Sequence, residues 1–183
     1  MLIDPRQATL LVVDIQEKLI GAMSEPAATL ARARWLLAAC ADLQLPTVIS
    51  EQYPQGLGPT VAALTAAAPN ATVVQKRHFS CVAGQCLPEA LLARRQVIVC
   101  GTETHVCVLQ TVLELLQLGK EVFVVEDACD SRVAASKQLG LARMRHAGAQ
   151  IVTREMVLFE LLGSADHPRF RHISKTYLVG DQP

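Results

Sequence analysis

Short runs of apolar, β-branched residues alternate along this chain with longer stretches of helical periodicity. Strands separated in this way by helices pair in parallel through right-handed crossovers. The pattern predicts strands at residues 8–14, 46–50, 71–76, 96–101, 121–125 and 150–152. It predicts helices at residues 28–45, 61–68, 87–94, 104–118, 136–147 and 153–162. We therefore expect an α/β chain: a three-layer α/β/α fold with a six-stranded, mostly parallel Rossmann-like sheet.

The composition indicates a folded chain, which we expect to form a single domain over residues 1–183. Hydrophobic residues make up 51% of the chain and charged residues 19%, which excludes a largely disordered protein. The 17 Lys and Arg residues balance the 17 Asp and Glu residues. With no basic excess, binding to nucleic acid by bulk electrostatics is disfavoured, and we expect no nucleic-acid partner.

No apolar run reaches the roughly 18 residues that a membrane helix needs. The longest candidate, residues 96–118, is interrupted by Gly101, Glu103 and His105. The first residues lack the basic and apolar parts of a secretory signal, so we expect no membrane association and a cytoplasmic location. The six cysteines show no CxxC pair and no Cys/His cluster at zinc spacing, which predicts free thiols and no metal site.

Parallel α/β sheets bind ligands at the carboxyl ends of their strands, and two charged residues end predicted strands. Asp14 ends the first strand, where a half-buried carboxylate needs a cation or hydrogen-bond donors; the alternative is that it caps the following turn. Lys76 ends the third strand, where it could hold a base or lower a thiol pKa; alone, it reads more simply as a solvated lysine.

Cys107 stands where the fourth strand turns into a long helix, in the segment Gly-Thr-Glu-Thr-His-Val-Cys-Val of residues 101–108. A helix N-terminus stabilises a thiolate and offers N–H groups to a developing oxyanion, so we interpret Cys107 as a nucleophile. The alternative is one more buried cysteine. His105 lies two residues before Cys107, so on one helix the two side chains point in different directions. We interpret His105 as part of the pocket wall or of an interface. Cys81 and Cys86 flank a glycine-containing loop, with no candidate base beside them.

Taken in order, these motifs resemble those of the isochorismatase-like cysteine hydrolases. They are the Val-Val-Asp-Ile-Gln run that contains Asp14, the strand-ending Lys76, and the turn that carries Cys107. That superfamily includes nicotinamidases and N-carbamoylsarcosine amidohydrolases. The resemblance extends from residue 8 to about residue 162, and residues 50–58 look like the subgroup of isochorismatase domain-containing proteins.

The resemblance implies a catalytic triad of Asp14, Lys76 and Cys107. Asp14 would take the thiol proton and later activate water, Lys76 would hold Asp14 and favour the thiolate, and Cys107 would attack an electrophilic carbon. It also implies a cis peptide bond between Thr102 and Glu103. The N–H groups of Glu103 and Cys107 would then bind the oxyanion.

Six residues are our candidates for lining the substrate pocket: Gln16, Leu19, Tyr53, Phe79, Thr104 and His105. Tyr53 and Phe79 would form a small, mostly apolar slot. Nicotinamidases carry an Asp and two His residues after the second strand, whereas residues 43–77 of this chain contain neither type. We therefore expect no metal and no cofactor, and nicotinamide is disfavoured as substrate. Isochorismatase itself lacks the nucleophilic cysteine, so Cys107 argues against vinyl-ether hydrolysis.

The sequence thus predicts a metal-independent cysteine hydrolase that cleaves a small amide, imide or related acyl substrate through a covalent Cys107 intermediate. A weakly charged surface and the habit of the family predict a homo-oligomer, either dimer or tetramer. Two other classes of function remain open. One is a catalytically weak scaffold or regulatory binding protein; the other is a redox sensor in which Cys107 is oxidised and another cysteine resolves it.

Overall fold

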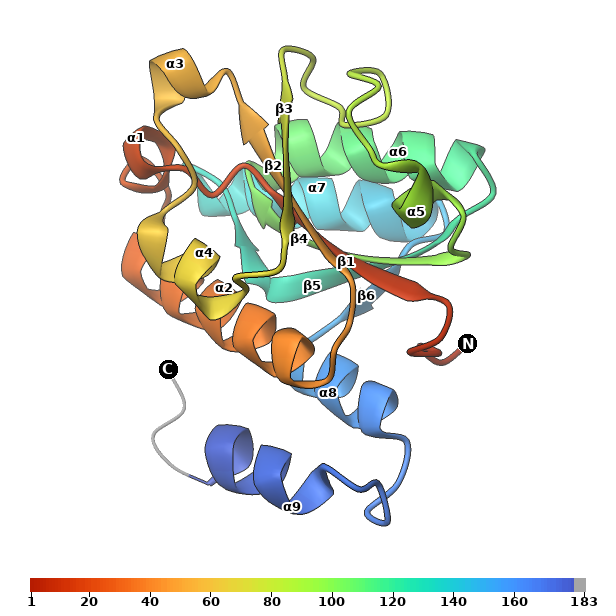
Figure 1. The fold of residues 1–183 in the computed structure, drawn as a ribbon. Coiled ribbons are helices and arrows are strands. Elements are labelled where there is room, and N and C mark those ends of the chain that lie inside the picture. Colours follow the sequence, from red (N-terminus) through yellow and green to blue (C-terminus); the bar gives the residue numbers. More distant parts are fainter. Residues whose placement is uncertain (180–183) are drawn as a thin grey trace.

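A computed structural model describes residues 1–179, and all the strands in it belong to one sheet. The strands are β1 (Ala8–Val13), β2 (Thr47–Gln52), β3 (Thr72–Lys76), β4 (Gln96–Thr102), β5 (Glu121–Asp130) and β6 (Gln150–Val152). Their order is β3-β2-β1-β4-β5-β6, and each neighbouring pair is parallel (Figure 1). The predicted six-stranded α/β fold is confirmed. Residues 180–183 of the expected domain lie outside the described residues.

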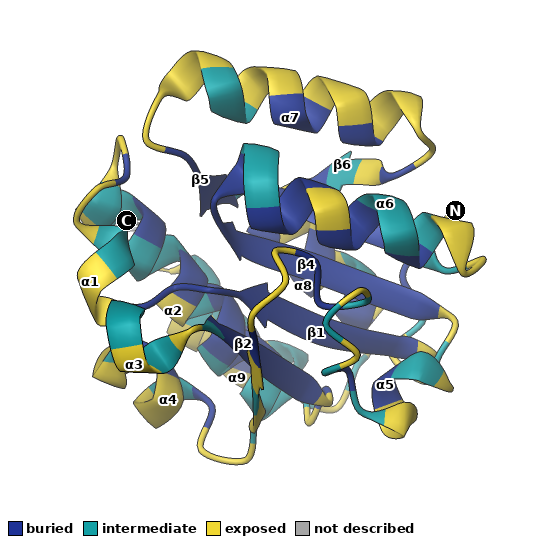
Figure 2. Ribbon diagram, turned by 90° about the horizontal axis from the view of Figure 1, so that it is seen from above, coloured by how far each residue is buried: buried dark blue, intermediate teal, exposed yellow. Residues whose placement is uncertain are grey.

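Helices cover both faces of the sheet and leave its central strands buried (Figure 2). One face carries α6 (Leu109–Gln117) and α7 (Ala134–His146), and the other carries α2 (Pro26–Asp42) and α8 (Arg154–Leu162). Shorter helical segments are α1 (Glu17–Ile20), α3 (Pro54–Leu57), α4 (Ala62–Ala67), α5 (Glu89–Leu92), η1 (Thr104–Val108), α9 (Phe170–Ile173) and η2 (Ser174–Leu178). Within residues 1–179, no helix is both long and apolar enough to cross a bilayer.

The apolar strands at the centre of the sheet are buried, whereas the edge strand is largely exposed. Every residue of β1 and β4 is buried, as expected for strands covered by helices on both faces. The edge strand β3 is largely exposed, and its only buried residue is Lys76. Burying a lysine costs free energy unless a partner compensates its charge, so the environment of Lys76 demands a specific explanation.

The structure differs from the sequence prediction in several segments, including the short helices α1 and α3, which were not predicted. Strand β5 continues to Asp130, whose carboxylate accepts hydrogen bonds from Ser24 Oγ and Thr29 Oγ1 and so ties the strand end to α2. The helix that contains Cys107 begins as the π-helical turn η1 rather than as a regular α-helix. The polar C-terminal stretch forms α9 and η2, which pack over α2 and α8 around the buried Ile173.

Gly101 allows β4 to pass directly against β1 beside Asp14. Its φ angle is +134°, and a Cβ atom there would lie 2.0 Å from the carbonyl oxygen of Val13. No rearrangement of a side chain could relieve that contact, because the obstructing atom belongs to the backbone. The close approach fixes the position at which the chain leaves β1.

We expect Gly101→Ala to lower the free energy of unfolding by about 3 kcal/mol or more, since it combines a backbone clash with an unfavourable φ angle. Gly21→Ala is the matched control, because Gly21 has φ of −64° and no atom within 4 Å of a new Cβ. Urea unfolding of both variants measures the difference. Equal stability of the two variants would contradict the close approach.

Candidate active site

The candidate site lies where the strand order reverses, between β1 and β4. Such switch points form crevices at the carboxyl ends of parallel strands. Asp14 directly follows β1, and Lys76 ends β3, two strands away. Lys76 Nζ donates to Asp14 Oδ2 at 2.7 Å, and both side chains have no exposed surface. The structure therefore brings together the two charged residues that the sequence analysis singled out.

The intervening strand β2 supplies two further polar groups to this ion pair. Ser50 Oγ donates to Asp14 Oδ1 at 2.7 Å, and Gln52 Oε1 accepts from Lys76 Nζ at 2.9 Å. The sequence analysis missed both residues. Their spacing of two along a strand that ends at the ligand-binding edge was the available signal, because residues i and i+2 lie on the same face of a sheet.

The backbone around Asp14 is held in an unusual conformation. Asp14 has φ of +53°, its N–H donates to the carbonyl of Ser50 at 3.1 Å, and its carbonyl accepts from Thr102 Oγ1 at 2.7 Å. A non-glycine residue with positive φ is uncommon and persists where neighbouring contacts enforce it. The carboxylate therefore leaves the sheet in a fixed direction.

Cys107 approaches Asp14 from the other side of the switch point. It lies in η1, is 6% exposed, and its thiol interacts with the Asp14 carboxylate. Asp14 is thus in contact with both Lys76 and Cys107. The three residues of the predicted triad form one connected buried cluster.

Electrostatics keep the Cys107 thiol protonated in the resting protein. Burial raises the pKa of Cys107 to about 12; the negative charge of Asp14 raises it too, and Lys76 opposes the shift. Burial also raises the pKa of Asp14 above 3.8, although Lys76 and Ser50 counteract it. Desolvation and the charge of Asp14 thus outweigh the favourable effect of Lys76 on the Cys107 thiolate.

The turn before Cys107 brings Glu103 toward a cation that the sequence analysis did not identify. The peptide bond between Thr102 and Glu103 is cis. Arg132 binds both carboxylate oxygens of Glu103, with Nε to Oε2 at 3.0 Å and Nη2 to Oε1 at 2.8 Å. His105 Nδ1 lies 3.0 Å from Ser131 Oγ and 3.9 Å from Glu103 Oε2. Glu103, His105 and Arg132 therefore form a polar cluster beside the turn.

Two of the predicted pocket residues serve to hold backbone. The Gln16 amide nitrogen donates to the carbonyls of Gln52 and Gly58, and its oxygen accepts from the N–H of Gln52. Thr104 is fully buried and donates through Oγ1 to the carbonyl of Asp130. These contacts position the loops around the candidate site, and neither side chain is exposed to a ligand.

The predicted apolar slot lies at the surface. Tyr53 and Phe79 are 40% and 53% exposed, and the Arg77 guanidinium stacks 4.2 Å from the centre of the Tyr53 ring. Leu19 is half-buried on α1. A hollow of about 410 Å³ lies between Tyr53 and the end of β3 and is lined by Lys76, Arg77 and other polar residues. The side of the site near Lys76 is therefore more basic than expected.

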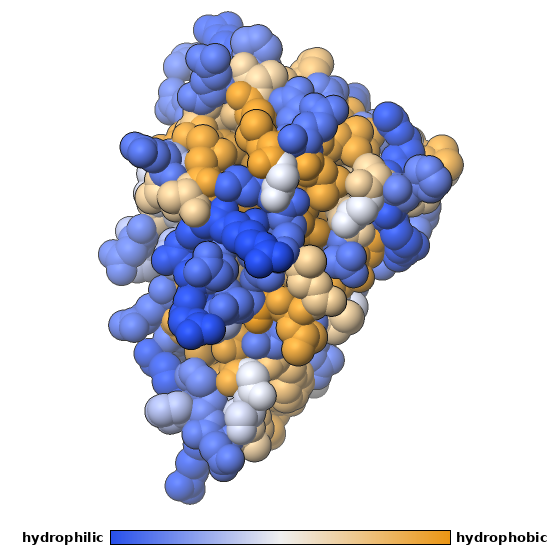
Figure 3. Space-filling model, turned by 90° about the vertical axis from the view of Figure 1, so that its right-hand side faces the viewer, coloured by the Kyte–Doolittle hydropathy of each residue, from blue (hydrophilic) through white to orange (hydrophobic). Residues whose placement is uncertain are grey.

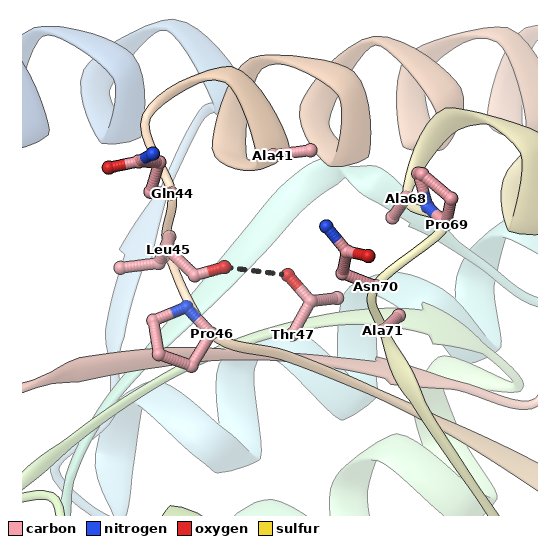
Figure 4. Close-up of a pocket in the computed structure, with 9 residues that line it drawn as sticks. All are labelled: Ala41, Gln44, Leu45, Pro46, Thr47, Ala68, Pro69, Asn70 and Ala71. Carbon is pink, nitrogen blue, oxygen red and sulfur yellow. Dashed lines mark hydrogen bonds between the residues drawn. The ribbon is translucent and has the colours of Figure 1, made fainter.

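A second hollow, of about 290 Å³, lies at the opposite end of the sheet (Figure 4). Its walls include Gln44, Thr47 and Asn70, and it contains no titratable side chain, so it offers no group for acid–base or nucleophilic chemistry. Among residues 1–179, no group of three or more His, Cys, Asp or Glu side chains is arranged to hold a metal ion.

Comparison with known proteins gives three findings that agree with one another. The family model "Isochorismatase domain" matches residues 8–156. Isochorismatase domain-containing protein 2 of Bos taurus is 42% identical over 174 residues, which cover 93% of this chain and 83% of that protein. The structure titled MAR1 ribonuclease from Caenorhabditis elegans has a TM-score of 0.92 at 36% identity, covering 100% of this chain and 95% of that one.

A third protein is similar over most of its length and carries no assigned substrate. The YcaC gene product of Escherichia coli is described as an octameric hydrolase of unknown specificity. Its TM-score is 0.85 at 26% identity, covering 97% of this chain and 96% of that one.

The position of the thiol proton predicts how alkylation of Cys107 depends on pH. With a pKa of about 12, the thiolate fraction and the iodoacetamide rate should rise about tenfold per pH unit between pH 7 and pH 10. Asp14→Asn removes a charge that raises this pKa, so we expect alkylation at pH 8 to become about tenfold faster or more. Lys76→Met removes an opposing charge and should slow it. Peptide mass spectrometry measures each rate.

The double variant Asp14→Asn/Lys76→Met is the control for these changes, because it leaves no unpaired buried charge. An alkylation rate that levels off below pH 9 in the wild-type protein would contradict a protonated Cys107 thiol. So would an Asp14→Asn variant that is alkylated more slowly than the wild type.

Proposed function

The chain belongs to the isochorismatase family, and we propose that it is a metal-independent cysteine hydrolase of a small amide, imide or related acyl compound. One observation carries this proposal: Asp14 contacts a buried lysine on one side and the Cys107 thiol on the other. A carboxylate held between a cation and a nucleophile is poised to accept the nucleophile's proton.

In the first half of the proposed reaction, the Cys107 sulfur bonds to the carbonyl carbon while its proton passes to Asp14. The carbonyl electron pair moves onto oxygen, where the N–H groups of Glu103 and Cys107 would stabilise it. Collapse of this intermediate breaks the C–N bond. The leaving amine takes the proton from Asp14, and a thioester to Cys107 remains.

In the second half, water adds to the thioester carbon and gives a proton to Asp14. The C–S bond then breaks, and the proton returns to the Cys107 sulfur. Burial supports this role because it raises the pKa of Asp14 and makes the carboxylate a stronger base than an exposed one. Lys76 acts through Asp14 as a positioning residue, since Asp14 and Gln52 occupy its ammonium group.

The surroundings favour a small substrate. Asp14 and Lys76 have no exposed side-chain surface and Cys107 is 6% exposed, so a bulky or polymeric compound would have to open the structure to reach the sulfur. No metal ion enters the proposed mechanism, because Lys76 already occupies the carboxylate that a metal would need.

Ribonuclease activity is the second candidate, since the C. elegans protein described as a ribonuclease is 36% identical over the full length. The neutral net charge and the enclosed cysteine make RNA a poor fit. A binding protein that retains the fold without turnover is the remaining alternative. An assay that includes small amides, imides and an RNA oligonucleotide distinguishes the three.

We expect wild-type protein to release amine or ammonia from at least one small amide or imide, and Cys107→Ala to lower that rate by about a thousandfold or more. Cys40→Ala is the matched control, because Cys40 is a buried thiol on α2, outside the candidate site. Mass spectrometry of quenched reactions should detect an acyl group on Cys107. RNA cleavage that persists in Cys107→Ala, or full amide turnover by that variant, would overturn the proposal.

We further propose a homo-oligomer, a dimer or tetramer. Apolar side chains reach the surface in several patches on the face shown in Figure 3. Large exposed apolar side chains include Leu139, Met156 and Phe159. Such surface is commonly covered by another subunit. Size-exclusion chromatography with light scattering should give at least twice the chain mass at micromolar concentration, and a monomer would contradict this assembly.

A further inference from the structure

Arg132, which has no role in the mechanism described so far, binds the Glu103 side chain in the turn before Cys107. Arg132 lies between β5 and α7, and Glu103 lies between β4 and η1. Thr102 and Asp130 are partners in the parallel pairing of β4 with β5, so the chain leaves both strands at the same edge of the sheet. The extension of β5 to Asp130 therefore brings Arg132 to the turn that precedes Cys107.

The two members of this ion pair differ strongly in exposure. The Glu103 side chain is 9% exposed, whereas the Arg132 side chain is 61% exposed and binds both carboxylate oxygens. His105 Nδ1 lies farther away, at 3.9 Å from Glu103 Oε2. A fully exposed ion pair contributes little to stability, but an almost buried carboxylate is left uncompensated when its cation is removed. Without Arg132, the Glu103 carboxylate would therefore have to move toward water.

Hydrogen bonds hold the chain on both sides of Glu103. Before it, Thr102 Oγ1 donates to the carbonyl of Asp14 at 2.7 Å. After it, Thr104 Oγ1 donates to the carbonyl of Asp130 at 2.8 Å. The ion pair adds a third point of attachment through the side chain, and three points fix the orientation of a residue in space.

This arrangement leaves the N–H of Glu103 available. Within residues 1–179 it donates no hydrogen bond, although Glu103 is only 7% exposed. Buried backbone N–H groups are nearly always paired, so an unpaired one in the turn that carries Cys107 indicates a ligand atom that accepts from it. The Glu103 carbonyl, by contrast, accepts from the N–H groups of Val106 and Val108. Glu103 is therefore held through its carbonyl and its side chain, and its N–H remains for a substrate oxygen.

We propose that Arg132 is a positioning residue for acyl transfer at Cys107. By holding the Glu103 side chain, it keeps the Glu103 N–H directed at the oxyanion that forms when the sulfur adds to a carbonyl carbon. Arg132 does not bind the substrate itself, since Glu103 already compensates its charge. This inference rests on the proposed function, because only a reaction that passes through an oxyanion needs this donor.

The size of the expected effect follows from what the oxyanion donor contributes. Complete removal of one such donor typically lowers the rate by about 10²–10³-fold. Loss of Arg132 loosens the donor without removing it, so we expect acyl transfer to become about tenfold slower. Reactions of Cys107 that form no oxyanion should keep their rates.

Two small, uncharged reagents separate these cases at the same sulfur. S-Methyl thioacetate acylates Cys107 through an oxyanion: the sulfur bonds to the carbonyl carbon, the C–S bond of the reagent breaks, and methanethiol leaves with the thiol proton. Iodoacetamide alkylates the sulfur by displacing iodide at a saturated carbon, and no oxyanion forms. The ratio of the acylation rate to the alkylation rate reports the oxyanion contribution, because a change in thiolate fraction or in access to Cys107 affects both rates.

We expect Arg132→Met to lower this ratio about tenfold, with an alkylation rate within about twofold of wild type. Arg132→Lys keeps the positive charge but loses the paired contact, so its ratio should lie between those of wild type and Arg132→Met. Arg6→Met is the matched control, because Arg6 binds both carboxylate oxygens of Asp4 in the same way, before β1 and away from the site. Its ratio should equal that of the wild type.

Gas chromatography of methanethiol counts each acylation even when water later cleaves the thioester, and peptide mass spectrometry measures alkylation. Both rates are corrected for those of Cys107→Ala. An Arg132→Met ratio equal to that of wild type would overturn the inference. So would a higher half-saturating thioester concentration with an unchanged limiting rate, which would mark a substrate-binding residue. A wild-type protein that is alkylated at Cys107 but releases no methanethiol would overturn the proposed function, and this inference with it.

Discussion

The buried contact between Lys76 and Asp14 is the interaction on which the rest of the site depends. Two opposite charges are stable without exposed surface only when they pair with each other and their remaining hydrogen-bonding groups also find partners. Here Ser50 donates to Asp14, and Gln52 accepts from Lys76. Removing one partner of such a pair typically costs about 3–5 kcal/mol, because the other charge is left buried alone. The edge strand β3 therefore has one position at which the side chain is tightly constrained.

This contact also determines where the proton of the candidate nucleophile resides. Lys76 stabilises the Asp14 carboxylate, and that carboxylate together with burial keeps Cys107 a thiol. The cluster is thus arranged for transfer of a proton during bond formation, and not for storage of a thiolate. The pKa of Cys81 is instead lowered, with the Cys86 thiol as the largest cause and Ser50 and Lys76 as further favourable neighbours.

The sequence predicted the six strands and the main helices because their apolar periodicities match the burial that two helical layers impose. The strand ends at Asp14 and Lys76 and the turn at Cys107 indicated where chemistry was expected, and the family resemblance implied that the three residues form a triad. The sequence did not predict the π-helical start at Thr104 or the extension of β5 to Asp130. These features depend on contacts between segments far apart in the chain, such as the hydrogen bond of Thr104 to the carbonyl of Asp130.

What the sequence determined by itself is the fold class and the strand ends that carry chemistry, because local periodicity and strand–helix alternation contain that information. The tertiary structure decided the protonation and partners of each group. The sequence analysis did not identify Ser50, Gln52 and Arg132, since their partners Asp14, Lys76 and Glu103 lie 24 or more residues away along the chain. A pKa is set by burial and by charges within a few ångströms, and only the folded chain specifies those distances.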